Sequence, residues 1–80
     1  MTEEEKAQHR RTYEANASEA NRILSSLSKR KLVADQIETV ARIKLLLQQA
    51  AEAMATDLSS AANLARRAAL LANELAGRGE

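Results

Sequence analysis

A few groups of residues in this sequence have types and spacings that could carry chemistry. His9 is the single histidine, and on a helix it lies near Glu5 and Tyr13, each four residues away. A metal ion bound there would lack enough strong ligands, because the chain has no cysteine to add to one imidazole and carboxylates. We therefore interpret His9 as a surface histidine, and we expect neither a bound metal nor a cofactor.

Two carboxylates and five serines could also suggest catalysis. Asp35 and Glu38 lie three residues apart, but in the first turn of a helix their simpler role is to stabilise the positive end of the helix dipole. The serines have no histidine or lysine placed as a base, so we interpret them as residues of helix ends. They are Ser25, Ser26, Ser28, Ser59 and Ser60. We expect no catalytic site and hence no enzyme.

Positive charge is concentrated between residues 22 and 44, although the net charge of the whole chain is only +1. Six cations in this stretch could contact phosphates, namely Arg22, Lys29, Arg30, Lys31, Arg42 and Lys44. No aromatic residues interleave with them for base stacking, so a small nucleic-acid-associated helical protein is the alternative interpretation and not the leading one. The run Lys29 to Lys31 could also touch an acidic membrane surface, but we expect no membrane insertion, because Trp and Phe are absent.

The composition limits the fold to helices. Alanine and leucine dominate, proline and phenylalanine are absent, and one tyrosine is the only aromatic residue, which favours helix over strand. Eighty residues suffice for one domain with a modest core. We therefore expect a single all-α domain spanning residues 1–80.

Capping signals and apolar periodicity divide the chain into three segments. Thr2 with Glu5 fits a capping box, which predicts a first helix over about 3–27. Its apolar stripe begins only at Tyr13, so residues 1–12 have little to bury, and frayed or disordered first turns are one expectation. A connection follows at about residues 28–33.

The second half of the chain is predicted to be an antiparallel helical hairpin, with helices over about 34–55 and 58–76. Asp57 is a suitable N-cap for the third helix, able to accept from the amides of Ser59 or Ser60, and Gly77 is a natural terminator. The predicted inner stripe of the second helix is Val33, Val40, Ile43, Leu47, Ala50, Ala51 and Met54, flanked by Ile37 and Leu46. With the first helix, the hairpin forms either a three-helix bundle or a hairpin-based oligomer.

The stretch from Ala50 to Ala65 is an alanine-rich helix end, an acidic cap and a new alanine-rich helix, which continues through Ala68, Leu71 and Leu75. This pattern, within residues 34–76, resembles the helical hairpins of tetratricopeptide-like proteins and of alanine-rich bacterial envelope proteins of unknown function. The resemblance implies a scaffold for protein contacts, with no catalytic residue to transfer. We accordingly expect a bacterial protein, either cytoplasmic or a fragment of an envelope protein.

Two leucines lie on the predicted outer sides of the hairpin, Leu45 on the second helix and Leu70 on the third. They could be covered by the first helix or could form a surface for self-association. The leading interpretation is a non-catalytic helical module for protein–protein interaction or assembly, as a homo-oligomer or with another protein. Leu45 and Leu70 are the candidate anchors, and Arg66 and Arg67 are candidate charges at the rim.

Overall fold

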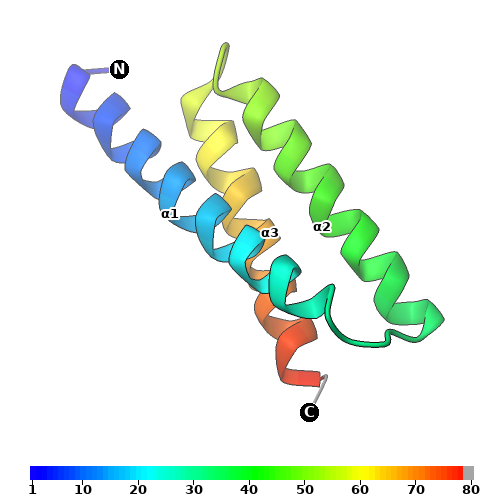
Figure 1. Ribbon diagram of the computed structural model, residues 1–80. Helices are drawn as coiled ribbons and strands as arrows, with labels where there is room; N and C mark the ends of the chain where they lie inside the picture. Colours follow the sequence, from blue (N-terminus) through cyan, green and yellow to red (C-terminus); the bar gives the residue numbers. More distant parts are fainter. Residues whose placement is uncertain (79–80) are drawn as a thin grey trace.

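The computed structural model describes residues 1–78 and the side chains up to Gly77, and these residues form three helices without a strand. Helix α1 is Glu3–Leu27, helix α2 is Ala34–Ala53 and helix α3 is Leu58–Arg78. The prediction of an all-α fold of three helices is confirmed, and the three starting points match those expected. Figure 1 shows α1 and α3 running in the same direction and α2 running in the opposite one.

Helix α1 begins with the predicted capping box. The Glu5 amide donates to Thr2 Oγ1 over 3.1 Å, and the Thr2 amide donates to Glu5 Oε1 over 3.0 Å. Two amides that the helix itself leaves without partners are thereby satisfied. The helix is continuous from Glu3, so its first turns are helical although its buried residues, Ala20, Ile23 and Leu27, lie in its second half.

The hairpin of α2 and α3 closes at Asp57, again as predicted. The Ser60 amide donates to Asp57 Oδ1 over 3.1 Å, and the Ser60 hydroxyl donates to Asp57 Oδ2 over 2.8 Å. The prediction for Gly77 is wrong: it lies inside α3, which runs to Arg78, and its φ is not positive. Glycine ends a helix by adopting a left-handed conformation, and Gly77 remains in the helical one.

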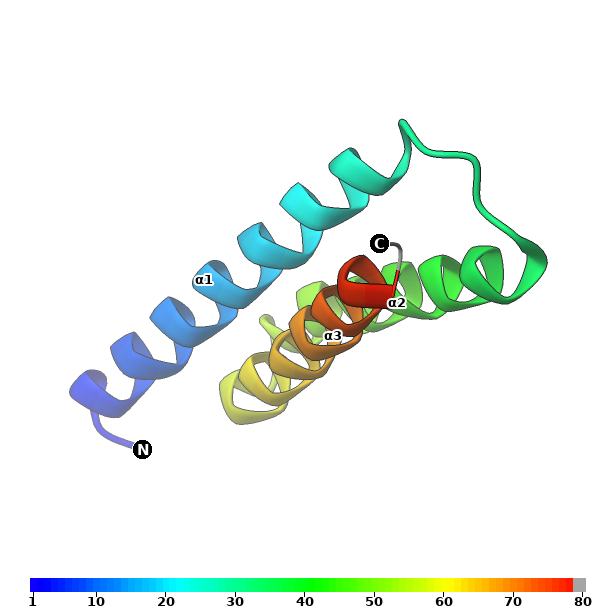
Figure 2. The ribbon, with the colours of Figure 1, turned by 90° about the horizontal axis from the view of Figure 1, so that it is seen from below.

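Helix α3 lies in the middle of the molecule. Helices α1 and α2 each pack along α3, whereas they touch each other only slightly, and Figure 2 shows them separated except at their connection. The buried residues of α3 explain this arrangement because they form two adjacent stripes, Ala61, Ala65, Ala68, Ala72 and Leu75 in one and Ala62 and Ala69 in the other. Small side chains on a broad face let two helices approach α3 side by side. The molecule is elongated, about 44 × 17 × 15 Å.

The core is thin and consists mostly of alanine. Its larger buried side chains are Ile23, Leu27, Ile43 and Leu75, and Ile43 is the largest that is fully buried. The predicted inner stripe of α2 is therefore only partly correct. Val33, Ile37 and Ala51 are exposed, because α2 packs against one helix and not two, so only the residues nearest Ile43 and Ala50 are covered.

Candidate interaction surface

The residues singled out for possible chemistry lie on helices or at their ends. Hydrogen bonds with the backbone and side chain of Thr2 lower the pKa of Glu5, and His9, half-buried on α1, adds a smaller effect in the same direction. Within residues 1–78, no group of three His, Cys, Asp or Glu side chains could hold a metal ion.

The serines and the two carboxylates Asp35 and Glu38 lie near helix ends. Asp57 caps α3 by accepting from the Ser60 amide, and the Ser28 hydroxyl donates to the Ser25 carbonyl oxygen over 2.7 Å at the end of α1. Asp35 and Glu38 are exposed near the start of α2. In the hydrogen bonds recorded among the described residues, the carboxylate that meets a serine hydroxyl is Asp57, whose partner Ser60 lies in the first turn of α3.

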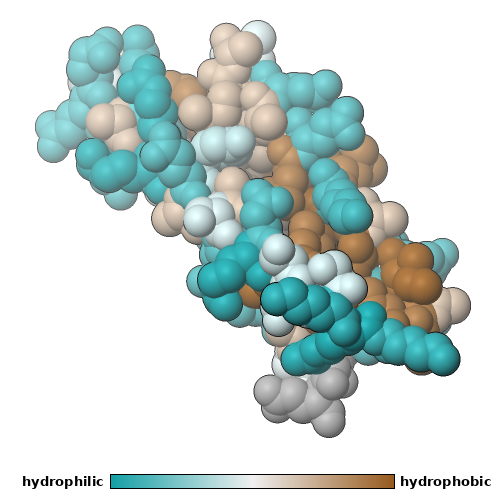
Figure 3. All heavy atoms as spheres, in the orientation of Figure 1, coloured by the Kyte–Doolittle hydropathy of each residue, from teal (hydrophilic) through white to brown (hydrophobic). Residues whose placement is uncertain are grey.

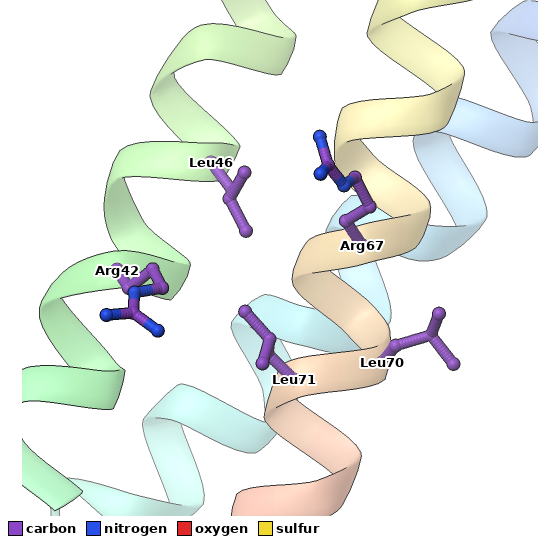
Figure 4. Close-up of a pocket in the computed structure, with 5 residues that line it drawn as sticks. All are labelled: Arg42, Leu46, Arg67, Leu70 and Leu71. Atoms are coloured by element: carbon purple, nitrogen blue, oxygen red, sulfur yellow. The ribbon is translucent and has the colours of Figure 1, made fainter. Parts of the chain in front are cut away.

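A pocket of about 390 Å³ lies between α2 and α3, on the side of the hairpin away from α1, and Figure 4 shows it with α1 passing behind. Five residues line it, namely Arg42, Leu46, Arg67, Leu70 and Leu71. We call it the α2–α3 pocket. Its volume is within the usual range for binding sites on proteins, but it is open to solvent and has no enclosing wall.

The leucines of the α2–α3 pocket differ in their exposure. Leu46 and Leu71 are half-buried and point into the space between the two helices (Figure 4). Leu70 points away from α2 and is 60% exposed. The pocket thus has an apolar floor that continues into an uncovered leucine at its edge.

Two guanidinium groups flank this floor, Arg42 from α2 and Arg67 from α3. Both side chains are exposed. The ion pairs recorded among the described residues are Lys6 with Glu3, over 3.4 Å, and Arg22 with Glu19, so neither pocket arginine has a carboxylate partner there. Positive charge around an apolar floor suits a partner that offers carboxylates beside apolar side chains.

The predicted interaction residues are only partly brought together. Arg67 and Leu70 line the pocket, whereas Leu45, 52% exposed, lies one turn beyond Arg42 on the same side of α2 and does not line it. Arg66 points elsewhere and donates to Asn63 Oδ1 over 3.4 Å. Neither leucine is covered by α1, which packs on the other side of α3.

The sequence pattern predicts different roles for the other lining residues. It indicates Arg42 as a nucleic-acid contact, Leu46 as a flank of the inner stripe of the second helix and Leu71 as part of the alanine-rich hairpin pattern. The spacing of these residues is the sequence signal for the pocket. Leu46 follows Arg42 by four residues and Leu71 follows Arg67 by four, which places each pair on one side of its helix.

The six cations of residues 22–44 do not form one surface. Arg22 is paired with Glu19, and Lys29, Arg30 and Lys31 are exposed in the connection between α1 and α2. Arg42 and Lys44 are two residues apart on α2 and therefore project from different sides of it. In the described part of the chain, no helix is long and apolar enough to cross a membrane.

Comparison with protein-family models, with curated proteins and with solved structures finds no match to this chain. The fold alone therefore defines the class of this protein, which is a small all-α domain of three helices. The resemblance of residues 34–76 to tetratricopeptide-like and alanine-rich envelope hairpins stays a prediction.

Proposed function

We propose that this chain is a non-catalytic helical assembly module that forms a homodimer through the outer face of the α2–α3 hairpin. The observation that carries the proposal is the α2–α3 pocket, an apolar floor with exposed Leu70 at its edge and two arginines that have no carboxylate partner among the described residues. Burial of this face against a second copy would remove leucine surface from water, the main favourable contribution to association.

The same face carries the opposite charge that a second copy requires. On α2, Asp35 and Glu38 precede Arg42 by seven and four residues, which places all three on one side of the helix. Acidic groups thus occupy the first turns of this side, and Arg42 occupies its middle. In a two-fold dimer each copy presents the same face, so the acidic end of one can meet the arginines of the other.

The charge of the whole molecule supports a second copy more than nucleic acid. A net charge of +1 produces little repulsion between two copies. A nucleic-acid binder concentrates its cations on one surface, whereas here Arg22 is paired and Arg42 and Lys44 project from different sides of α2.

Complementary charge reversal tests the proposed partner. One variant combines Arg42→Glu with Arg67→Glu, and the other combines Asp35→Lys with Glu38→Lys, so that each alone presents like charges to its own copy. Sedimentation velocity of each variant and of their equimolar mixture is the measurement. We expect the mixture to contain heterodimer, with less association in either variant alone.

Circular dichroism of both variants verifies that they remain helical. The proposal is contradicted if each variant associates as well as the wild type, or if the mixture contains only monomers. A pair of matching reversals at Arg10 and Glu14, which are exposed on α1, serves as the control and is expected to leave association unchanged.

A further inference from the structure

A second exposed surface lies at the end of the molecule where α1 connects to α2. Lys29, Arg30 and Lys31 are exposed in this connection, and two uncovered aliphatic side chains follow, Val33 at 63% and Ile37 at 56% exposure. We call these five residues the basic–aliphatic tip. It is separate from the α2–α3 pocket, because Ile37 and Arg42 project from different sides of α2.

The backbone at the tip fixes the two aliphatic side chains close together. Val33 is the N-cap of α2, and the Ile37 amide donates to the Val33 carbonyl oxygen over 3.0 Å, so the pair lies on one side of the first turn. A hollow of about 210 Å³, lined by Val33, Asp35, Gln36, Thr39 and Leu75, lies at the first turns of α2. These turns are therefore not packed tightly on α3, and Val33 and Ile37 stay in water.

The backbone that carries Lys29 and Arg30 is also hydrogen-bonded to the end of α1. The Lys29 amide donates to the Ser26 carbonyl oxygen over 3.3 Å, and the Arg30 amide donates to the Leu27 carbonyl oxygen over 3.0 Å, which extends the end of α1 by tight turns. Lys44 follows Ile37 by seven residues and adds a cation on the same side of α2.

One of the two nearest carboxylates along the chain faces away from this combination. Glu38 follows Val33 by five residues and lies on the other side of α2, whereas Asp35 lines the hollow beside Val33. Figure 3 shows hydrophobic side chains along α2 bordered by hydrophilic ones over the connection between α1 and α2. The tip therefore offers positive charge and aliphatic surface together.

We infer that the basic–aliphatic tip docks on an anionic lipid surface. Lysine and arginine next to such a surface gain from its negative potential, and Val33 and Ile37 can lose exposed apolar surface against the headgroup layer without insertion of a helix. The tip is a projecting connection, not a groove, so it matches a broad flat partner. Nucleic acid would use the cations but would leave the two aliphatic side chains without a contact.

Vesicle sedimentation with the full chain tests the inference. The probes are vesicles of equal parts phosphatidylserine and phosphatidylcholine, and vesicles of phosphatidylcholine alone. We expect binding to the anionic vesicles only. Replacing Lys29, Arg30 and Lys31 by Gln is expected to lower the partition coefficient about a hundredfold, and Ile37→Gln about tenfold. An increase in ionic strength from about 0.1 M to about 1 M should weaken binding, because the Debye length shortens from about 10 Å to about 3 Å.

Two matched variants control for net charge and for apolar surface. Replacement of Lys6, Arg10 and Arg11 by Gln removes the same charge from the opposite end of α1. Leu45→Gln removes an exposed leucine about two turns further along α2, away from the connection. Both variants are expected to bind as the wild type does. Equal binding to neutral vesicles, or equal loss from the control variants, overturns the inference. The inference is also overturned if the chain binds a mixed-sequence DNA duplex and this binding requires Lys29, Arg30 and Lys31 but not Ile37. That result would assign the tip to nucleic acid. Leu70→Glu distinguishes lipid binding from dimerisation. This variant changes the proposed dimer face and leaves the tip intact, so it should still bind the anionic vesicles.

Discussion

Asp57 and Ser60 are joined by two hydrogen bonds, from the Ser60 amide over 3.1 Å and from its hydroxyl over 2.8 Å. This pair caps α3 at the point where the chain reverses after α2. Because the connection is short, the cap also fixes how α2 and α3 lie side by side. The α2–α3 pocket, which the two helices share, depends on that arrangement.

The cap predicts a loss of stability in acid. Hydrogen bonds from the amide and hydroxyl of Ser60 lower the pKa of Asp57 below its ordinary value of 3.8, with smaller effects from the Ser59 amide and His9. The carboxylate therefore stabilises the fold above pH 3.8, and its contribution is lost as the pH falls through the lower pKa of the folded state. Asp57→Ala should lower Tm by about 4–8 °C at neutral pH.

The difference in Tm between the wild type and Asp57→Ala should narrow as the pH is lowered, measured by circular dichroism across the acid range. A difference that stays constant or widens in acid would show that the charge of Asp57 does not stabilise the cap.

Ile43 should be the most sensitive position on α2. It is the largest fully buried side chain, and Ile43→Ala should lower the free energy of unfolding by about 2–5 kcal/mol. Ile37→Ala removes the same atoms from a side chain that is 56% exposed. This variant should change the free energy of unfolding by no more than about 0.5 kcal/mol. Urea denaturation of the two variants compares them, and similar losses would contradict the described core.

The buried alanines of α3 should be required because their side chains are small. Ala65 is fully buried, so Ala65→Leu has no space to fill and should cost about 1–3 kcal/mol by overpacking. Ala41→Leu, on the exposed side of α2, is the control and should have little effect. If Ala65→Leu were neutral in urea denaturation, the neighbouring helices would not approach α3 as closely as described.

The capping box should protect the first turn of α1. Thr2→Ala removes the acceptor of the Glu5 amide and should cost about 1 kcal/mol at this helix end. Amide hydrogen exchange followed by NMR should show faster exchange at Glu5 and little change at Leu24. Unchanged exchange at Glu5 would mean that the cap contributes nothing.

Local signals made most of the fold predictable. Thr2 with Glu5 and Asp57 with Ser60 are short-range devices whose partners are three residues apart, so the sequence displays them directly. The error at Gly77 has the same origin, because glycine permits a helix to end but does not force it to.

Exposure was harder to predict than helix position. Val33 and Ile37 belong to an apolar pattern that is typical of a core, yet α1 does not cover them, because it packs on α3. Which helix lies in the middle of a three-helix domain depends on long-range packing that periodicity does not specify. The α2–α3 pocket was missed in part for this reason, since Arg42 and Arg67 meet only after α2 and α3 pair.

Sedimentation equilibrium over a wide range of protein concentration tests the proposed dimer most directly. The wild type, Leu70→Glu at the edge of the α2–α3 pocket and Ile37→Glu on a different side of the hairpin are compared, with circular dichroism to verify folding. We predict a concentration-dependent dimer for the wild type and Ile37→Glu, and a folded monomer for Leu70→Glu. A wild type that stays monomeric throughout, or a dimer that persists in Leu70→Glu, would contradict assembly through this face.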